Sequence, residues 1–386
     1  MRICMISYSF YESDGRVRQY AESLSMRGDH VDVLSLAGNA DEPYGKINGV
    51  NIYRLQKRVV NEKGRYLYLF RLLRFLVLSG YWITRMHLKN PYNVVHVHNV
   101  PDFEVFCAII PKLTGAKVIL DIHDILPEFY AEKFHAGKEC LTYKLLLIIE
   151  KMSMAFADHV IIANHIWQER IFGRSVRNGK CSVIMNYPNP AIFHPRTVKK
   201  DAGKFVLLFP GSLNRHQGLD IAIKAFFRIK DVIPEGEFHI IGEGAEKPAL
   251  EKLITDLGLE MRVIFHERLP LDKIAEEMAK ADAGIVPKRD DGFGGEAFST
   301  KTWEFMSLNI PIIIARTRID DFYFNDEIVR FFQPGDEESL ANSIVELWRN
   351  ERAREEQIWN ASEYIKDKNW ELRKQDYFDI LKQLVP

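Results

Sequence analysis

The chain has 386 residues, of which 47% are hydrophobic and 27% are charged. A chain of this length predicts about two domains, and this composition excludes a disordered or collagen-like protein. The 52 basic and 53 acidic residues leave a formal net charge of −1, which excludes a chain-wide basic surface for nucleic acid. We therefore expect a globular protein of two domains that does not bind nucleic acid.

The cysteines and the longest apolar segments bear on the cellular compartment. The four cysteines form no CxxC motif, and most lie in apolar stretches, so we expect buried thiols in a reducing environment; they are Cys4, Cys107, Cys140 and Cys181. We expect no signal peptide, and no segment reaches the ~18 consecutive apolar residues of a membrane span. These features predict a cytoplasmic protein.

In the first half of the chain, short apolar runs alternate with amphipathic segments. Strands are expected at 3–8, 30–36, 94–98, 117–122, 160–163 and 182–185, and helices at 16–26 and 103–112. Runs of Val, Ile and Leu that are separated by helices are typical of a parallel sheet covered on both faces. The first half is therefore predicted to be a doubly wound α/β domain.

The segment 63–89 differs from its surroundings, because it carries six cations and no acid among many aromatic and aliphatic residues. The cations are Lys63, Arg65, Arg71, Arg74, Arg85 and Lys89. A basic helix rich in aromatic residues can lie on an anionic membrane surface. Alternatively, the helix is mostly buried and its arginine stems lie along apolar surface.

A break in the pattern separates the two halves. Residues 186–195 contain three prolines, and a charged stretch follows to residue 204. The alternation then resumes, with strands expected at 205–209, 237–241, 262–266, 283–287, 311–315 and 329–332, and helices at 218–230, 248–257, 271–280, 300–308 and 336–350. We predict two Rossmann-like domains, 1–195 and 196–369, that face a central cleft, with ligands at the carboxyl ends of the strands.

Two acidic residues of the second half lie eight positions apart. Glu296 falls in a glycine-rich loop after the strand 283–287, and Glu304 falls about one turn into the next helix. The backbone amides of residues 298–301 would form a helix N-terminus, which attracts phosphate. One carboxylate can then reach a sugar while the other accepts hydrogen bonds from ribose. Alternatively, both are ordinary charges near a helix start.

The first strand–helix turn of the second half is a second candidate for phosphate binding. Gly211 permits close approach of the backbone, Arg215 offers a forked donor for pyrophosphate, and Gln217 offers a neutral donor. A glycine turn with one arginine is weak evidence by itself, and it equally fits an ordinary turn.

In the first half, His123 and Asp124 follow directly on the strand 117–122, where a residue that faces the cleft is expected. His96 and His98 share one face of their strand, but no third ligand follows at a suitable spacing, so we expect no metal site. Gly15 ends the first strand–helix loop and either admits a phosphate or sugar near the backbone or forms an ordinary turn.

Taken together, these motifs resemble the family 4 glycosyltransferases, which are retaining, nucleotide-sugar-dependent enzymes of the GT-B fold. The resemblance covers nearly the whole chain. It rests on Gly28-Asp-His-Val31, His98-Asn-Val-Pro-Asp102, His123-Asp124, Gly211-Ser-Leu with Gln217-Gly218, Ile240-Ile-Gly-Glu-Gly244, Glu296 with Glu304, and Asn369-Trp370 with Tyr377. It also implies that a C-terminal helix at about 370–386 packs back on the first domain.

The resemblance implies a role for each matching residue. Glu296 and His123 would be catalytic, with no covalent nucleophile, and Glu304 would hold the ribose. The donor-binding set would be Gly15, Gly211, Ser212, Arg215, Gln217, Gly242, Phe298, Ser299, Thr300, Lys301 and Glu304, and the acceptor-side set His98, Asn99, Asp102 and Asp124. Many family members carry Arg and Lys where this chain has Ser212 and Gln217, so Arg215 and Lys301 are expected to compensate.

The implied activity is transfer of a sugar from a nucleotide-sugar donor, with UDP-sugars favoured, to a glycan or lipid-linked acceptor in cell-surface polysaccharide synthesis. Neither a metal nor another cofactor is expected, because arginine and helix amides can meet the charge of the departing diphosphate. The enzyme is expected in the cytoplasm, where residues 63–89 would contact the inner face of the cell membrane. The alternatives are a nucleotide-sugar 2-epimerase of the same fold and a non-catalytic nucleotide-sugar-binding module.

Overall fold

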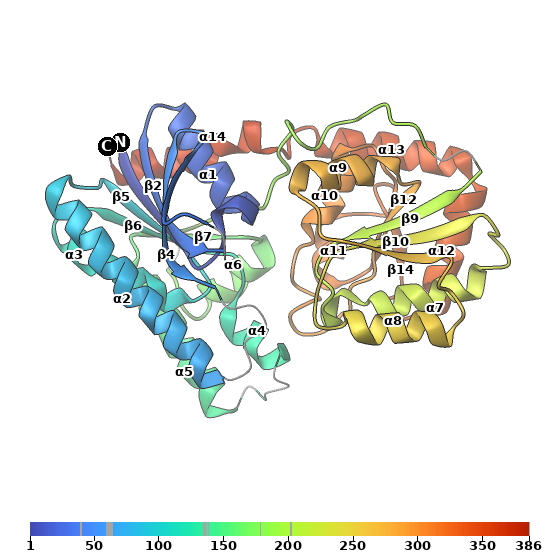
Figure 1. Ribbon diagram of the computed structural model, residues 1–386, viewed down its shortest axis with the longest axis horizontal. Helices are drawn as coiled ribbons and strands as arrows, with labels where there is room; N and C mark the ends of the chain where they lie inside the picture. Colours follow the sequence, from blue (N-terminus) through green and yellow to red (C-terminus); the bar gives the residue numbers. More distant parts are fainter. Residues whose placement is uncertain are drawn as a thin grey trace. The chain divides into compact units, whose positions relative to one another are not determined.

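The computed structural model describes residues 1–38, 41–58, 65–133, 137, 139–177, 179–200 and 203–385. The chain divides into two compact units (Figure 1). The N-terminal unit comprises Met1–Asn186 and Arg373–Pro386, and the C-terminal unit comprises Tyr187–Leu372.

The first division falls nine residues before the predicted boundary at 195. The ring of Tyr187 stacks on Trp303 with the centroids 5.2 Å apart, and the carbonyl of Pro188 accepts a hydrogen bond from the amide of Trp370 at 3.1 Å. Phe193 is also buried. The start of the proline-rich segment therefore packs as part of the C-terminal unit rather than serving as a free linker.

The N-terminal unit is built on an eight-stranded sheet of order β3-β4-β2-β1-β5-β6-β7-β8, in which only β3 runs antiparallel to its neighbour. The strands are β1 (Arg2–Ser7), β2 (His30–Ala37), β3 (Tyr44–Ile47), β4 (Val50–Lys57), β5 (Val94–His98), β6 (Lys117–Ile122), β7 (His159–Ile162) and β8 (Cys181–Val183). The six predicted strands are confirmed. The sequence analysis did not predict β3 and β4, although the Asn48-Gly49 turn between them, with positive φ at both residues, is a hairpin signal.

The helices of this unit are α1 (Gly15–Met26), α2 (Arg65–Lys89), α3 (Ile109–Leu113), α4 (Leu126–Lys133), α5 (Leu141–Phe156), α6 (His165–Phe172) and α14 (Trp370–Leu384), with short 3-10 turns η1 (Tyr11–Ser13) and η2 (Asp102–Ala108). The predicted helix at 103–112 is therefore mostly 3-10 in character. Helix α14 lies beside α1, since the rings of Tyr20 and Tyr377 are 4.4 Å apart (Figure 1). Tyr377 also hydrogen-bonds Nδ1 of His96 at 2.9 Å.

Helix α2 buries one face and exposes the other. Leu72, Phe75 and Ile83 are buried, whereas Phe70, Val77 and Tyr81 are among the most exposed large apolar residues, and 62% of Phe70 is accessible to solvent. Within the described residues, α2 is the one helix whose length and composition are compatible with crossing a membrane, over Leu67–Lys89. Helix α2 therefore fits neither expectation completely. One face packs on the sheet and on η2, and the opposite face is exposed.

The C-terminal unit has a fully parallel six-stranded sheet of order β11-β10-β9-β12-β13-β14. Its strands are β9 (Phe205–Pro210), β10 (Gly236–Ile241), β11 (Val263–His266), β12 (Ala283–Val286), β13 (Ile312–Ala315) and β14 (Arg330–Phe332). Its helices are α7 (Leu219–Ile229), α8 (Lys247–Asp256), α9 (Leu271–Lys280), α10 (Thr300–Ser307), α11 (Arg318–Tyr323), α12 (Glu337–Arg349) and α13 (Glu351–Ile365), with the 3-10 turn η3 (Arg215–Gln217). All six predicted strands are confirmed. Buried apolar residues of the sheet and of helices α7, α8 and α12 form one continuous core.

Candidate functional site

The backbones of two glycine turns meet at the carboxyl ends of β9 and β10. Gly211 has φ +152° and Gly242 has φ +151°, and a Cβ atom at Gly242 would lie 1.9 Å from the carbonyl oxygen of Gly211. The amide of Gly211 donates to the carbonyl of Ile241 at 2.8 Å. A side chain at position 242 would collide with the backbone of Gly211, so the close approach of the two turns requires glycine there.

Lys301 of α10 lies against the first of these turns. Its Nζ donates to Oε1 of Gln217 at 3.3 Å and lies 5.1 Å from the ring centroid of Phe209. Burial lowers the pKa of Lys301 to about 8, and the neighbouring Glu304 opposes that shift. The structure therefore brings together Gly211, Gln217 and Lys301.

Glu304 lies one helical turn after Lys301 on the same helix. Burial raises the pKa of its carboxyl, while Lys301 and a hydrogen bond from Thr300 oppose this rise. The side chain is half-buried. A carboxylate in this setting can accept hydrogen bonds from sugar hydroxyls at little added desolvation cost.

The N-terminus of α10 supplies uncapped polar groups. Ser299 is the N-cap residue but makes no side-chain capping bond, and its buried hydroxyl has no hydrogen-bond partner within the described part of the chain. The ring of Phe298 packs against Trp303, with the ring centroids 4.6 Å apart. The amides at Thr300 and Lys301 remain available to an anion.

Glu296 is largely buried, with 7% of its surface exposed, and it accepts a hydrogen bond from Nη1 of Arg318 at 2.7 Å. The next residue is also held, because the carbonyl of Ala297 accepts from Nζ of Lys288 at 2.8 Å. Lys288 in turn forms a buried ion pair with Asp320 at 2.7 Å. Two cations that the sequence analysis did not single out, Arg318 and Lys288, therefore fix the loop that carries Glu296.

Arg215 and Ser212 lie on the exposed side of the turn after β9. In the residues that the structure describes, the guanidinium of Arg215 forms no ion pair, while its carbonyl accepts a hydrogen bond from Arg289 at 3.2 Å. Arg289, which was also not predicted, pairs with Asp220 at 2.5 Å. Lys301 lies beside Gln217, and Arg215 is exposed on the same turn. Their expected compensation for missing cations stays a prediction.

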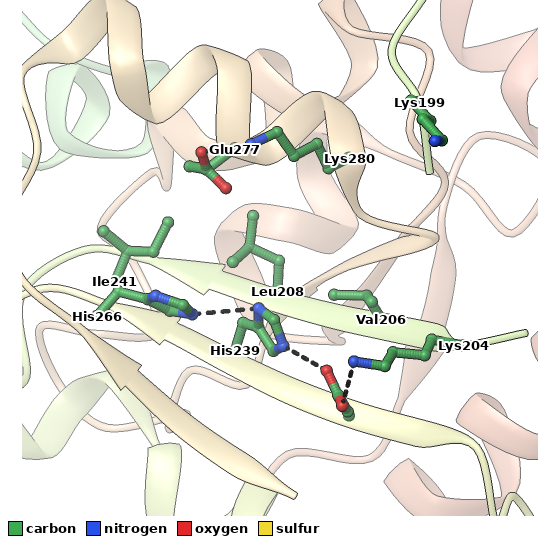
Figure 2. Close-up of a pocket in the computed structure, with 10 residues that line it drawn as sticks. Lys199, Lys204, Val206, Leu208, His239, Ile241, His266, Glu277 and Lys280 are labelled. Carbon is green, nitrogen blue, oxygen red and sulfur yellow. Dashed lines mark hydrogen bonds and ion pairs between the residues drawn. The ribbon is translucent and has the colours of Figure 1, made fainter. Parts of the chain in front are cut away.

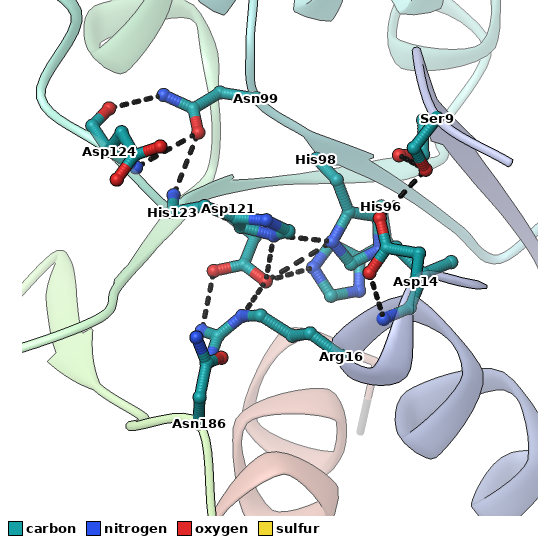
Figure 3. A network of polar contacts seen from close by, with 12 residues as sticks. Ser9, Asp14, Arg16, His96, His98, Asn99, Asp121, His123, Asp124 and Asn186 are labelled. Atoms are coloured by element: carbon teal, nitrogen blue, oxygen red, sulfur yellow. Dashed lines mark hydrogen bonds and ion pairs between the residues drawn. The ribbon is translucent and has the colours of Figure 1, made fainter. Parts of the chain in front are cut away.

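In the N-terminal unit, a polar network surrounds the buried carboxylate of Asp121 (Figure 3). Arg16 binds both of its oxygens, from Nε at 2.8 Å and from Nη2 at 2.7 Å. Nδ1 of His98 and Nε2 of His123 each lie 3.2 Å from Oδ2. Arg16 also donates to Oδ1 of Asn186 at 2.7 Å. His123 is the partly exposed member of this network.

Three of the four residues predicted on the acceptor side are buried, namely His98, Asn99 and Asp102. Asn99 donates to Asp102 at 2.8 Å and to the carbonyl of Asp124 at 2.7 Å, and its Oδ1 accepts from the amide of His123 at 2.7 Å. Burial raises the pKa of Asp102 to about 7. The three residues therefore support the His123–Asp124 turn, and their expected place on the acceptor side stays a prediction.

Gly15 begins α1, and a Cβ atom there would meet nothing within 4 Å. Glycine is therefore not required by packing at this position. The neighbouring Asp14 caps the helix by accepting a hydrogen bond from the amide of Val17 at 3.1 Å.

One group of side chains in the described residues has the composition of a metal site. His96, His98 and Asp121 offer ligand atoms within 4.8 Å of one another. Because the guanidinium of Arg16 already engages both oxygens of Asp121, a second cation would have to displace it or lie beside it. This donor set suits an ion-pair network better than a divalent metal.

A separate pocket of about 180 Å³ lies against β9, β10 and β11 of the C-terminal unit (Figure 2). Its charged groups are joined in a chain: Lys204 pairs with Glu237 at 2.9 Å, Glu237 with His239 at 2.9 Å, and His239 with His266 at 3.1 Å. None of the predicted site residues lines it. The pocket therefore does not include Gly211 or Gly242, although Ile241 and His266, which end β10 and β11, line it.

Two family models match the chain, one in each half. Residues 15–187 match the "Glycosyl transferase 4-like domain", and residues 192–364 match "Glycosyl transferases group 1". The chain belongs to the family 4 glycosyltransferases of the GT-B fold. The two matches adjoin near residue 190, close to the division between the two units.

Similar proteins agree with this family assignment. The chain is 25% identical to the O-antigen chain mannosyltransferase RfbU of Salmonella typhimurium over 62% of each chain, so the match spans less than two thirds of that relative. It is 22% identical to an uncharacterized glycosyltransferase of Methanocaldococcus jannaschii, over 76% of this chain and 74% of the relative. Among solved structures, sucrose-phosphate synthase of Thermosynechococcus elongatus matches with a TM-score of 0.82 and 20% identity, over 100% of this chain and 99% of that one.

Each unit contains polar groups that were not singled out from the sequence: Arg16 and Asp121 in the N-terminal unit, and Lys288 and Arg318 in the C-terminal unit. One of them had a local signal. Asp121 and His123 are two residues apart at the end of a strand, a spacing that places both side chains on one face. The partners of Asp121 and Glu296 had no such signal, because Arg16 is 105 residues from Asp121 and Arg318 is 22 residues from Glu296.

Proposed function

We propose that this glycosyltransferase transfers a sugar, with retention of anomeric configuration, from a UDP-sugar to a glycan or lipid-linked acceptor in cell-surface polysaccharide synthesis. The observation that carries this proposal lies at the carboxyl ends of β9 and β10, where the side chain of Lys301, from the first turn of α10, crosses the backbone of Gly211. A diphosphate needs such a combination of close backbone, amides and a cation.

The proposed roles follow the arrangement of polar groups. The diphosphate binds the amides at Thr300 and Lys301 together with the ammonium of Lys301, and Arg215 reaches it from the exposed turn. Glu304 accepts hydrogen bonds from the ribose. Glu296, held by Arg318, contacts the transferred sugar and supports the positive charge that develops on it. His123 contacts the same sugar.

The choice of UDP draws on the names of similar proteins. Solved structures of HepE from Anabaena, 17% identical to this chain with a TM-score of 0.75, contain UDP with glucose or UDP-glucose. Another relative is a GDP-mannose-dependent mannosyltransferase of Mycolicibacterium smegmatis, 25% identical over 26% of this chain. The base therefore has to be determined by experiment, and GDP-sugars are the principal competitor.

We further propose that neither metal nor cofactor takes part. Lys301, Arg215 and the helix amides provide the positive potential that a divalent cation provides in other transferases. If so, donor binding is unchanged by EDTA.

A thermal-shift panel of UDP-, GDP- and ADP-sugars tests donor binding, since a ligand that binds only the folded state raises the melting temperature. We expect the largest shift with UDP-sugars, with and without EDTA. Replacement of Glu304 by Gln should reduce the shift for UDP and abolish the difference between UDP and its 2′-deoxy analogue. Glu251→Gln, an exposed carboxylate on α8, is the control.

Product analysis distinguishes the remaining activities. Transfer with retention gives a product whose anomeric configuration by NMR equals that of the donor. Conversion of the UDP-sugar to its 2-epimer without acceptor would instead identify an epimerase. Donor binding that survives Glu296→Gln, without turnover on any acceptor, would identify a non-catalytic module.

We also propose that the protein works in the cytoplasm at the inner face of the membrane. The exposed face of α2 combines Phe70, Val77 and Tyr81 with the exposed cations Arg74, Arg85 and Lys89. Helix α5, which packs on the same η2 segment as α2, exposes Leu141, Leu145, Ile148 and Met152 at helical spacing. Lys63 of the predicted basic segment lies outside the described residues, and the side chain of Arg65 is likewise not described.

A further inference from the structure

The carboxylate of Asp121 is ionised and fully engaged. Burial alone would raise its pKa, but the guanidinium of Arg16 and the ring of His123 outweigh burial and hold the pKa of Asp121 well below its usual range. The two hydrogen bonds from Arg16 are bidentate, which fixes the plane of the carboxylate.

One oxygen of this carboxylate meets two imidazole rings (Figure 3). Nε2 of His123 and Nδ1 of His98 each lie 3.2 Å from Oδ2, and the two nitrogens are 3.1 Å apart. An ionised carboxylate has no hydrogen to donate, so the hydrogen in its bond with His123 belongs to Nε2. Burial lowers the pKa of His98, so that ring is neutral and shares the same acceptor through its Nδ1 hydrogen.

The other nitrogen of His123 is left for a ligand. Nδ1 of His123 makes no hydrogen bond within the described residues, and 20% of this side chain is exposed. The backbone amide of His123 donates to Asn99 at 2.7 Å, which fixes the turn on which the ring stands. The ring is therefore held on its Nε2 edge and open on the other.

We propose that Asp121 is the positioning residue of His123: it keeps the hydrogen on Nε2, so that Nδ1 presents a lone pair to a hydroxyl group of the transferred sugar. His123 thus acts towards the ligand as a hydrogen-bond acceptor, and the group it recognises is a hydroxyl donor. The identity of that ligand rests on the proposed function, whereas the position of the hydrogen does not.

The position of the hydrogen can be measured in the native protein. In protein labelled with ¹⁵N-histidine, two-bond correlations between ring nitrogens and ring carbon-bound hydrogens separate the two neutral tautomers, and His123→Gln assigns the signals. We expect the pattern of a ring protonated on Nε2. A ring protonated on Nδ1 would overturn the proposal without reference to activity.

Variants test whether Asp121 works through His123. Asp121→Asn places an amide group opposite the donors of Arg16 and beside Nε2 of His123. The NMR signals of the His123 ring should therefore move. The kcat should fall about tenfold or more, with little change in the KM for the donor. In the His123→Gln background, Asp121→Asn should cause no further loss of kcat. If Asp121→Asn lowered kcat by the same factor in the His123→Gln background as in the native protein, Asp121 would act independently of His123 and the positioning role would be overturned.

Asp32 provides a matched control on the same sheet. It is fully buried on β2, pairs with Arg2 at 3.1 Å and accepts a hydrogen bond from Tyr92 at 2.6 Å, but it makes no contact with His123. Asp32→Asn should lower stability while leaving the His123 signals in place. If Asp121→Asn fails to fold, the tautomer of the native protein still decides the matter. An Nε2 tautomer in a protein that transfers no sugar would leave the positioning role of Asp121 standing, and it would refute both the proposed function and the sugar hydroxyl as the ligand of His123.

Discussion

The side chain of Lys301 crosses the backbone of Gly211 so closely that a Cβ atom at position 211 would lie 2.3 Å from Cε of the lysine. Gly211 lies in the turn after β9 and Lys301 lies on α10. Because Gly211 has no side chain, the ammonium group of Lys301 can lie against this turn. We regard this relationship as the basis for diphosphate binding in the C-terminal unit.

Gly211→Ala should therefore displace Lys301 and weaken UDP binding about tenfold or more, and the positive φ of 152° adds strain of about 1 kcal/mol or more. Isothermal titration with UDP measures the first effect and thermal melting the second. Gly258→Ala is the control, since Gly258 also has a positive φ but a Cβ atom there meets nothing within 4 Å. Equal UDP affinity of the native protein and Gly211→Ala would contradict the assigned role.

The affinity for UDP should also depend on pH through Lys301. Because burial lowers the pKa of Lys301 to about 8, the ammonium that attracts the diphosphate is present below that pH and is lost above it. We expect affinity to fall about tenfold between about pH 7 and about pH 9. In Lys301→Arg the guanidinium stays charged over this range, so the dependence should largely disappear. A slope of the same size in this variant would contradict the role of the Lys301 ammonium.

Binding to lipid vesicles should depend on the exposed cations of α2. The triple change Arg74→Gln, Arg85→Gln and Lys89→Gln should reduce sedimentation with phosphatidylglycerol vesicles more than tenfold, because each cation near an anionic surface contributes about 1 kcal/mol. Three exposed cations of the C-terminal unit, Lys273, Lys280 and Arg352, give a control with the same change of charge. Failure of the native protein to bind these vesicles would remove the membrane proposal.

Stability should decrease with rising pH through Glu104. Burial raises the pKa of this fully buried carboxyl to about 8, so over the range from about 4.5 to about 8 the folded state holds a proton that the unfolded state has lost. The free energy of unfolding consequently falls as pH rises through that window. Glu104→Gln cannot titrate, so its advantage over the native protein should grow by about 3 kcal/mol between about pH 5 and about pH 8.5 in urea unfolding.

Glu150→Gln is the comparison for this experiment. Glu150 is buried in the same unit but pairs with Arg174 at 2.6 Å, so removing its charge should lower stability at both pH values. A stability difference for Glu104→Gln that does not change with pH would contradict the buried, protonated state.

The sequence predicts the parallel strands well because continuous runs such as 117–122 and 312–315 are buried on both faces, and a run of that kind has few other solutions. It also locates Gly211, Glu296 and Glu304, since each follows a strand or begins a helix. The strand pair β3 and β4 escaped prediction because its residues are partly exposed and alternate poorly, which leaves only the Asn48-Gly49 turn as a signal.

The burial of individual polar residues could not be predicted. From the sequence, His98 and Asp102 lie at or just after the end of a strand, where exposure to a ligand is expected. In the structure both side chains are buried, and Asp102 accepts a hydrogen bond from Asn99. Likewise, the ion pairs that hold Glu296 and Asp121 join residues distant in sequence, and no periodicity reports such partners. A single sequence therefore identifies the loops that carry the chemistry more readily than the side chains that support them.

The N-terminal unit is discontinuous: the chain leaves it at Asn186 and rejoins it at Arg373. The returning segment contributes Tyr377, which is fully buried and hydrogen-bonded to His96. During synthesis on the ribosome, the unit that begins first is thus completed last, after the intervening unit has emerged. Until residues 373–384 have been synthesised, the surface that buries Tyr377 stays uncovered, and translation that stops before residue 373 would leave it exposed.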